Sequence, residues 1–169
     1  MPNVLKNSRA LYALHSVGCL ADVACKPAVG VFIRQATETK TFHLTTDYRS
    51  RAAQELIAQQ PIVSAAQYHS WCRKNLRHEH MVPTSVILKM LLNEPNLSVE
   101  FIAGVLRRYG LRATITKQED RVLNSAGLAR KMPPQFDEAG SPMFQNPCAR
   151  YMQAGLFDGL VRRTDASWF

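Results

Sequence analysis

The sequence has no long apolar run, no closely spaced cysteine pair and few acidic residues, and each absence excludes a class of protein. Nowhere do eighteen apolar residues occur together, and the first thirty residues lack the basic, apolar and small segments of a secretory signal. None of the four cysteines belongs to a C-x-x-C pair, which argues against a structural zinc site. We therefore expect a cytoplasmic protein without a membrane span, whose cysteines stay reduced.

Internal repeats and low-complexity tracts are missing as well, which excludes a solenoid or a repeat array. The 169 residues include 46% hydrophobic residues, enough for one domain with a real core and against wholesale disorder. We expect an N-terminal lobe at 1–75, a catalytic core at 76–132 and a loop-rich tail at 133–169 that packs on the core.

Acidic residues are scarce relative to basic ones. The chain has 13 Asp and Glu against 21 Lys and Arg, a formal charge of +8. A basic protein gains free energy by releasing the counterions that surround a phosphate backbone. The charge therefore indicates nucleic acid as the first partner to consider. We expect DNA before RNA, and no membrane partner, because no long apolar run occurs.

The local patterns predict an α+β fold of mixed helices with short strands. Apolar spacing, capping residues and prolines indicate most of the helices, and alternation indicates the strands. We expect helices at 4–17, 47–60, 61–77, 84–94, 98–109 and from 117, and strands at 29–33, 41–44 and 111–116.

The most informative segment is 76–83, which places His78, Glu79 and His80 in basic surroundings directly before a helix. Hydrolysis of a phosphodiester needs a cation to offset negative charge and a base to take a proton from water. Imidazole titrates in the range that suits the base, and carboxylate oxygens suit a hard ion such as Mg²⁺ or Mn²⁺. The segment thus indicates metal-assisted hydrolysis.

The pattern Glu79-His80-x-x-Pro83, followed by Ser85 and an apolar helix, resembles the first half of the His-Asn-His (HNH) nucleases. The run at 115–120, Ile-Thr-Lys-Gln-Glu-Asp, is similar to the second half of that family, in which a strand leads into a helix with a metal ligand. The resemblance covers about residues 76–125. It implies a ββα-metal core in which the two helices between 84 and 109 are an insertion.

The resemblance also implies roles for individual residues. His80 would be the general base, Glu79 a metal ligand, and Asp120 or Glu119 the ligand from the closing helix. Asn124 lies one helical turn beyond Asp120 and could supply an amide ligand instead. In an extended segment His78 and His80 point to the same side, so the two histidines could also share one metal.

Basic side chains near this motif could contact phosphate. By their place next to the motif, Lys117 and Arg121 are candidates, together with Arg77. Arg107 and Arg108 lie away from the apolar stripe of the helix at 98–109, either as a solvated face or as contacts with nucleic acid.

Three other interpretations of the same residues stay open. Glu119 and Asp120 in a first helical turn could simply complement the helix dipole. The chain could be a non-catalytic module that binds nucleic acid through its basic helix at 98–109. It could also be a docking or inhibitor subunit of a larger assembly, in which the histidines have no catalytic role.

Overall fold

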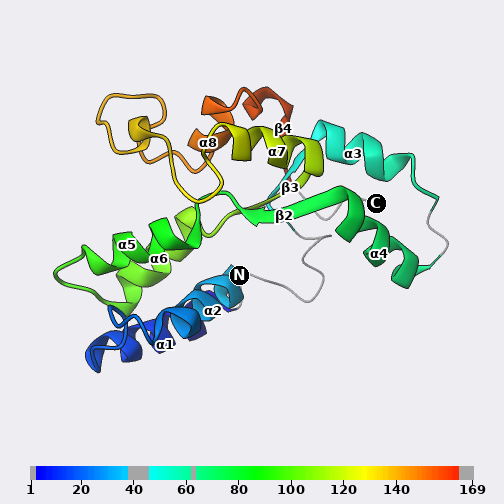
Figure 1. Ribbon diagram of the computed structural model, residues 1–169. Coiled ribbons are helices and arrows are strands. Elements are labelled where there is room, and N and C mark those ends of the chain that lie inside the picture. The colour runs from blue at the N-terminus through cyan, green and yellow to red at the C-terminus, as the bar shows by residue number, and fades with distance from the viewer. Residues whose placement is uncertain (1–2, 38–45, 62–63, 164–169) are drawn as a thin grey trace. The chain divides into compact units, whose positions relative to one another are not determined.

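In the computed structural model the described residues form an α+β fold with eight α-helices, two short 3₁₀ helices and a four-stranded mixed sheet (Figure 1). The structure describes residues 3–37, 46–61 and 64–163. Contacts group the chain into two compact units, each made from two separate stretches. Unit 1 comprises the described parts of Met1–Lys40 together with His80–Leu111, and unit 2 those of Thr41–Glu79 and Arg112–Phe169. The segments 1–75, 76–132 and 133–169 stay a prediction, since compact units need not coincide with folding domains.

Unit 1 is helical. It contains α1 (Val4–Ser16), α2 (Lys26–Thr37), α5 (Thr84–Leu92) and α6 (Val99–Tyr109). Helices α1 and α5 each pack on α2 and α6. The blue ribbons of α1 and α2 lie side by side in Figure 1. Apolar side chains spaced three or four apart fill the centre, which is the pattern expected of amphipathic helices. The fully buried ones include Leu11, Ile33, Ile87, Leu91, Ile102 and Leu106.

The strand expected at 29–33 is wrong, because these residues form the middle of α2. The β-branched residues there alternate and so resemble a strand. In the folded chain Val29, Ile33 and Ala36 are buried, four and three positions apart, which is a helical period. Packing against α1 therefore overrides the local preference. The strand expected at 41–44 lies outside the described residues.

Unit 2 contains the sheet, whose strand order is β2-β3-β1-β4. Strands β1 (Tyr48–Ser50) and β3 (Arg112–Thr116) are parallel, with Tyr48 opposite Ala113. Strand β4 (Leu160–Arg162) is antiparallel to β1, with Ser50 opposite Leu160. Strand β2 (Leu76–His80) lies next to β3 and crosses the unit boundary, which falls after Glu79.

Helices of unit 2 begin at polar caps. Ser50 caps α3 (Arg51–Ala58), Ser64 caps α4 (Ala65–Asn75) and Thr116 caps α7 (Lys117–Ser125). The helix expected from 47 therefore begins after Ser50. The Asp47 carboxylate instead accepts a hydrogen bond from the backbone N–H of Arg112, at 2.9 Å. Helices α3 and α4 share an apolar cluster formed by Ala53, Tyr68, Cys72 and Leu76.

The tail expected to be loop-rich contains short regular elements. Its α8 (Ala149–Gln153) follows a 3₁₀ turn at Pro134–Phe136, and a second turn at Phe157–Gly159 leads into β4. Phe136 and Tyr151 are buried, so the tail packs through large aromatic side chains. Within the described part of the chain, no helix is both long and apolar enough to cross a lipid bilayer.

Candidate functional site

Strand β2 carries the three residues that the motif singles out. In an extended strand successive side chains point to opposite faces, so His78 and His80 lie on one face and Glu79 on the other. All three are half-buried. Each has its own hydrogen-bond partner, supplied by a different element of the fold.

The Glu79 carboxylate lies against α8. Its Oε1 is 3.3 Å from Nη2 of Arg150, whose side chain is 1% exposed, and it also accepts a hydrogen bond from the Tyr151 hydroxyl. Arg150 donates two further bonds, to the carbonyl oxygens of Leu128 at 2.8 Å and Ala129 at 3.3 Å. A buried cation needs such compensation for lost hydration. The Oε1 atom of Glu79 therefore belongs to a buried polar network with Arg150 and Tyr151.

Burial changes the acidity of the Tyr151 hydroxyl in this network. Tyr151 is fully buried, and burial raises the pKa of its hydroxyl well above the ordinary value, with a further contribution from the Glu79 charge. The phenol therefore stays protonated and remains a hydrogen-bond donor to the carboxylate. The Glu79 carboxylate thus lies between two donors, an arrangement that holds it in one orientation.

His78 is oriented from the other side of the strand by two threonines. Its Nδ1 lies 2.8 Å from the Thr114 hydroxyl on β3, and that hydroxyl lies 2.9 Å from the Thr46 hydroxyl. Both threonines are buried. A hydrogen bond to one ring nitrogen is the usual way in which proteins set the orientation and tautomer of a functional imidazole.

His80 is held within unit 1. Its Nε2 lies 3.0 Å from the Thr37 hydroxyl at the end of α2. Gly110 ends α6 close to that threonine, and a Cβ at this glycine would come within 2.3 Å of the Thr37 methyl group and 2.4 Å of the Leu106 carbonyl oxygen. Only glycine fits at this position. Because Gly110 has no side chain, Thr37 can stay where its hydroxyl orients the His80 imidazole.

Glu119 is the third residue of α7, and its Oε2 accepts three hydrogen bonds. They come from the backbone N–H of Thr116 at 2.7 Å, the Thr116 hydroxyl at 2.9 Å and the Ser50 hydroxyl at 2.7 Å. Thr116 in turn accepts from the Glu119 N–H, which completes a capping box. Glu119 therefore closes the start of α7, and Ser50 joins the starts of α3 and α7.

Asp120 is paired with Arg77. The Arg77 Nε lies 3.2 Å from Oδ2 of Asp120, and the two side chains are 52% and 23% exposed. This ion pair joins β2 to α7. Asp120 thereby partly neutralises Arg77, which the sequence predicts to contact phosphate. Asn124 is exposed at the far end of the same helix.

The other candidate phosphate contacts lie on exposed or half-buried helical surfaces. On α7, Lys117 is half-buried and Arg121 is exposed, with the Arg121 guanidinium 3.3 Å from the Gln118 side-chain oxygen. On α6, Arg107 and Arg108 are exposed, and the Arg108 guanidinium lies 5.2 Å from the centre of the Tyr109 ring.

Sequence reasoning missed the residues that position the motif. Arg150 and Tyr151 were expected only as part of a packed tail, and Thr114 and Ser50 carried no expectation beyond a strand and a helix. The one local signal is that Arg150 lies between residue types that are commonly buried, Ala149 and Tyr151. A cation in such a position needs an acidic partner, but the sequence does not indicate which acid.

Carboxylates in unit 2 offer the oxygen donors that Mg²⁺ or Mn²⁺ prefers. Among the described residues, however, no three His, Cys, Asp or Glu side chains form a group that could hold a metal ion. Mg²⁺ in proteins commonly binds one or two carboxylates and keeps several waters. A site of that kind needs fewer protein ligands than a closed cluster.

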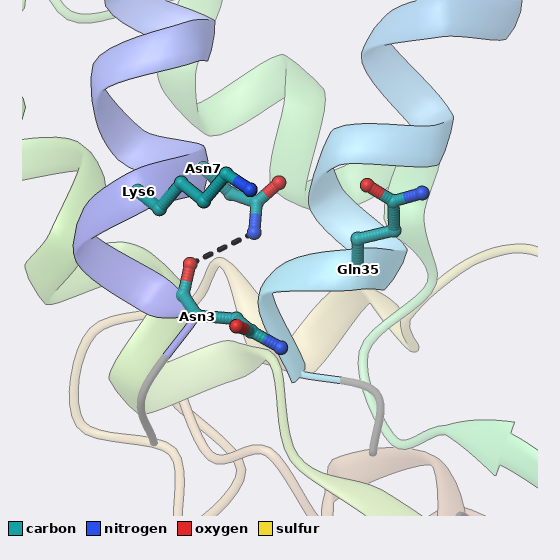
Figure 2. Close-up of a pocket in the computed structure, with 4 residues that line it drawn as sticks. All are labelled: Asn3, Lys6, Asn7 and Gln35. Atoms are coloured by element: carbon teal, nitrogen blue, oxygen red, sulfur yellow. Dashed lines mark hydrogen bonds between the residues drawn. The ribbon is translucent and has the colours of Figure 1, made fainter. Parts of the chain in front are cut away.

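A separate pocket of about 180 Å³ lies in unit 1, where Asn3, Lys6 and Asn7 of α1 face Gln35 of α2 (Figure 2). The Asn7 side-chain amide donates to the Asn3 carbonyl oxygen at 2.8 Å, and this bond ties the start of α1 together. None of the four lining residues carries a carboxylate, an imidazole or a thiol. Among the described residues, Lys6 is the one lining residue with a titratable side chain, and no carboxylate or imidazole lines the pocket beside it.

The contacts around β2 are thus the best candidate for a functional site in the described residues. The resemblance to HNH nucleases directs attention to the same strand. Comparison of the chain with protein-family models, with curated proteins and with solved structures finds no match.

Proposed function

We propose that the chain is a metal-dependent nuclease that hydrolyses the phosphodiester bonds of DNA. The observation that carries the proposal is the order of elements in unit 2. Strand β2, with His78 and Glu79, is the sheet neighbour of β3, and α7 follows β3 directly with Glu119 in its first turn. Two neighbouring strands and a helix in this order are what the resemblance to an HNH-like ββα-metal core implies.

The helices between β2 and β3 support the idea of an insertion. The resemblance requires that α5 and α6 interrupt the core, because they separate its two halves in the sequence. Both helices pack with α1 and α2 in unit 1, while β3 and α7 belong to unit 2. Because the inserted helices pack with α1 and α2, strands β2 and β3 can pair although they lie far apart in the chain.

The donor chemistry suits a hard divalent ion. Glu79 uses Oε1 for Arg150 and Tyr151, and Glu119 uses Oε2 for its cap and for Ser50. Each carboxylate has a second oxygen, and Mg²⁺ or Mn²⁺ binds carboxylate oxygen, water and substrate phosphate. When bound, such an ion offsets the negative charge that develops on the phosphate.

The remaining roles are those that the resemblance implies. His80, which follows Glu79 in the chain, takes the proton from the attacking water, with its imidazole oriented by Thr37. The charge of +8 brings the polyanionic substrate to the protein, with Arg77, Lys117 and Arg121 as its nearest contacts in unit 2.

A second candidate is a non-catalytic module that binds nucleic acid. One observation favours it: each expected carboxylate ligand already has a protein partner, Glu79 with Arg150, Glu119 with its cap, and Asp120 with Arg77. On this reading the carboxylates are structural and the basic residues alone contact phosphate.

A cleavage assay with added metal separates the two candidates. The purified chain is incubated with supercoiled plasmid or with an RNA transcript, with Mg²⁺ or Mn²⁺ and with EDTA. We expect plasmid cleavage that needs the divalent ion. The variant His80→Ala should lose at least about 100-fold in rate, because a general base contributes that much, and should bind DNA within a few fold of the unchanged chain.

The matched control is His69→Ala, which removes an exposed histidine of α4 in unit 2 and should cleave normally. If His80→Ala cleaves as fast as the unchanged chain, the assignment of His80 is wrong. If neither chain cleaves but both shift DNA in a salt-dependent way, the non-catalytic module is the correct reading.

A further inference from the structure

The first turns of α1 place a polar side chain where the buried face of the helix favours an apolar one. Val4 and Leu11 are 1% and 0% exposed, and Asn7 lies between them on the same face at 5% exposed. Residues three or four positions apart share a helix face, so the apolar pattern predicts a hydrophobic side chain here. Burial of an amide costs free energy unless its hydrogen bonds are satisfied. The proposed nuclease does not use Asn7, so the residue needs its own account.

The Asn7 amide uses only part of its hydrogen-bonding capacity. Its Nδ2 donates to the Asn3 carbonyl oxygen at 2.8 Å, and the Asn7 backbone N–H bonds to the same oxygen at 3.0 Å. Among the described residues, no group donates to its Oδ1. Figure 2 shows this oxygen pointing away from Asn3, toward the side on which Gln35 of α2 lies. A buried acceptor without a donor from the described chain thus faces the pocket.

The other three lining side chains are polar, and their groups are unused as well. Asn3 is the N-cap residue of α1, but its side chain makes no capping hydrogen bond. Neither Lys6 nor Gln35 has an ion pair or a side-chain hydrogen bond to another described residue. Polar groups that only stabilise a fold usually bond to one another. Here the unused groups of two helices line one pocket of about 180 Å³.

The lining groups indicate the class of ligand. Lys6 supplies a cation at the start of α1, where the first turn has no acidic residue and the helix dipole is positive. These features favour one anionic group, such as a phosphate. The amides offer neutral donors and acceptors, which suit hydroxyl groups because each hydroxyl both donates and accepts. No aromatic residue of the described chain lines the pocket to stack on a base.

We propose that this pocket binds a phosphorylated ribose, with the phosphate at Lys6 and the hydroxyl groups between Asn7 and Gln35. A cavity of roughly 150 Å³ holds one benzene ring, so a volume of about 180 Å³ matches a single sugar ring. Lys6 is exposed, which leaves the phosphate at the mouth of the pocket. The same chemical group occurs as a free sugar phosphate and as the 5′-phosphorylated end of an RNA strand.

The test is isothermal titration calorimetry of the full chain with ribose 5-phosphate at low salt. We expect one site per chain, and at least about tenfold weaker binding of ribose alone or of inorganic phosphate alone, because each makes only part of the contacts. Asn7→Leu keeps a similar volume and should weaken binding about tenfold. Its midpoint of urea denaturation should not fall, because leucine suits the buried face. Replacement of an asparagine with a purely structural role would instead lower the midpoint.

A second pair of variants tests the phosphate contact without touching the helix packing. Lys6→Gln should bind ribose 5-phosphate no more tightly than the unchanged chain binds ribose. Lys26→Gln is the matched control, because it removes the same charge from an exposed position at the start of α2. Its affinity for ribose 5-phosphate should stay within about twofold of that of the unchanged chain, as expected for a charge screened by solvent.

A short RNA strand with and without a 5′-phosphate distinguishes the two sources of the ligand. A gain in affinity from the 5′-phosphate that Asn7→Leu abolishes identifies a strand end, and the absence of such a gain identifies a free sugar phosphate. Three results would overturn the proposal: no binding of ribose 5-phosphate at millimolar concentration, equally tight binding of inorganic phosphate, or equal effects of Lys6→Gln and Lys26→Gln. None of these results depends on nuclease activity.

Discussion

The Glu79 carboxylate is 3.3 Å from a guanidinium nitrogen of Arg150, and the Arg150 side chain is almost completely buried. The same guanidinium binds the carbonyl oxygens of Leu128 and Ala129, so it joins strand β2 to the segment after α7 and to α8. Removing one partner of such a pair leaves an uncompensated buried charge, which costs more than the intact pair contributes. The relationship makes Arg150 the residue on which the orientation of Glu79 depends.

Arg150→Met should lower the free energy of unfolding by about 3 kcal/mol, because it leaves Glu79 without its cationic partner and two carbonyl groups without their donor. Urea denaturation monitored by circular dichroism measures the change. The matched control, Arg73→Met on the exposed last turn of α4, should change stability by less than about 0.5 kcal/mol. Equal effects of the two variants would show that the buried pair is not a stabilising contact.

Ser50→Ala should destabilise unit 2 more than the loss of an ordinary helix cap does. Ser50 accepts from the Ala53 N–H at 3.1 Å and also donates to Glu119 at 2.7 Å, so the variant loses two hydrogen bonds, about 2 kcal/mol in all. Ser64→Ala removes a cap whose hydroxyl has no second partner among the described residues, and should cost about 1 kcal/mol. Denaturant unfolding of both variants measures the difference between their free energies of unfolding. Equal losses would show that the hydrogen bond from Ser50 to Glu119 contributes nothing to stability.

Asp120→Asn should strengthen binding to DNA about threefold. The carboxylate partly neutralises Arg77, and its removal leaves this cation to the phosphate backbone, so the dependence of log K on log salt should steepen by up to about 0.9. Fluorescence anisotropy over a range of salt concentrations measures both quantities. Folding stability should change by less than about 1 kcal/mol, because the pair is exposed. A large loss of cleavage without a gain in affinity would instead identify Asp120 as a metal ligand.

Asp47→Asn should remove a pH dependence of stability that the unchanged chain shows. Burial raises the pKa of Asp47 above its ordinary value, while the Arg112 N–H and the charges of Arg112 and Arg162 lower it in part. The folded state therefore binds the proton more tightly than the unfolded state does. Relative to the variant, the unchanged chain should gain stability as pH falls from the raised folded-state pKa towards the unfolded-state value.

Urea denaturation of both chains at several pH values measures this difference. If the unchanged chain instead loses stability relative to Asp47→Asn as pH falls through that window, hydrogen bonding dominates over burial at Asp47, and the sign of the shift is reversed.

Much of the local structure could be predicted from the sequence. Ser98 and Thr116 cap helices as expected, and β3 alternates as a strand should, because capping and alternation depend on neighbouring residues. The segment at 29–33 could not be predicted correctly, because its β-branched residues favour a strand locally while its burial against α1 requires a helix.

The sequence predicts which residues form the candidate site, but it does not predict which residues contact them. Glu119 was recognised as an acid at a helix start, and it proves to complete a capping box. That Ser50 also binds it could not be foreseen, because the two residues lie 69 positions apart. Hydrogen bonds over such separations depend on how the sheet assembles.

The sequence by itself determined the excess of positive charge, the helix caps at Ser98 and Thr116 and the order of His78, Glu79 and His80, since these depend only on residue type and on neighbours in the chain. Tertiary structure alone decided that Arg150 and Tyr151 bind Glu79, that Thr114 orients His78 and that Arg77 pairs with Asp120. The physical reason is that a charge removed from water must find a partner, and the partner is whichever group the folded chain brings near.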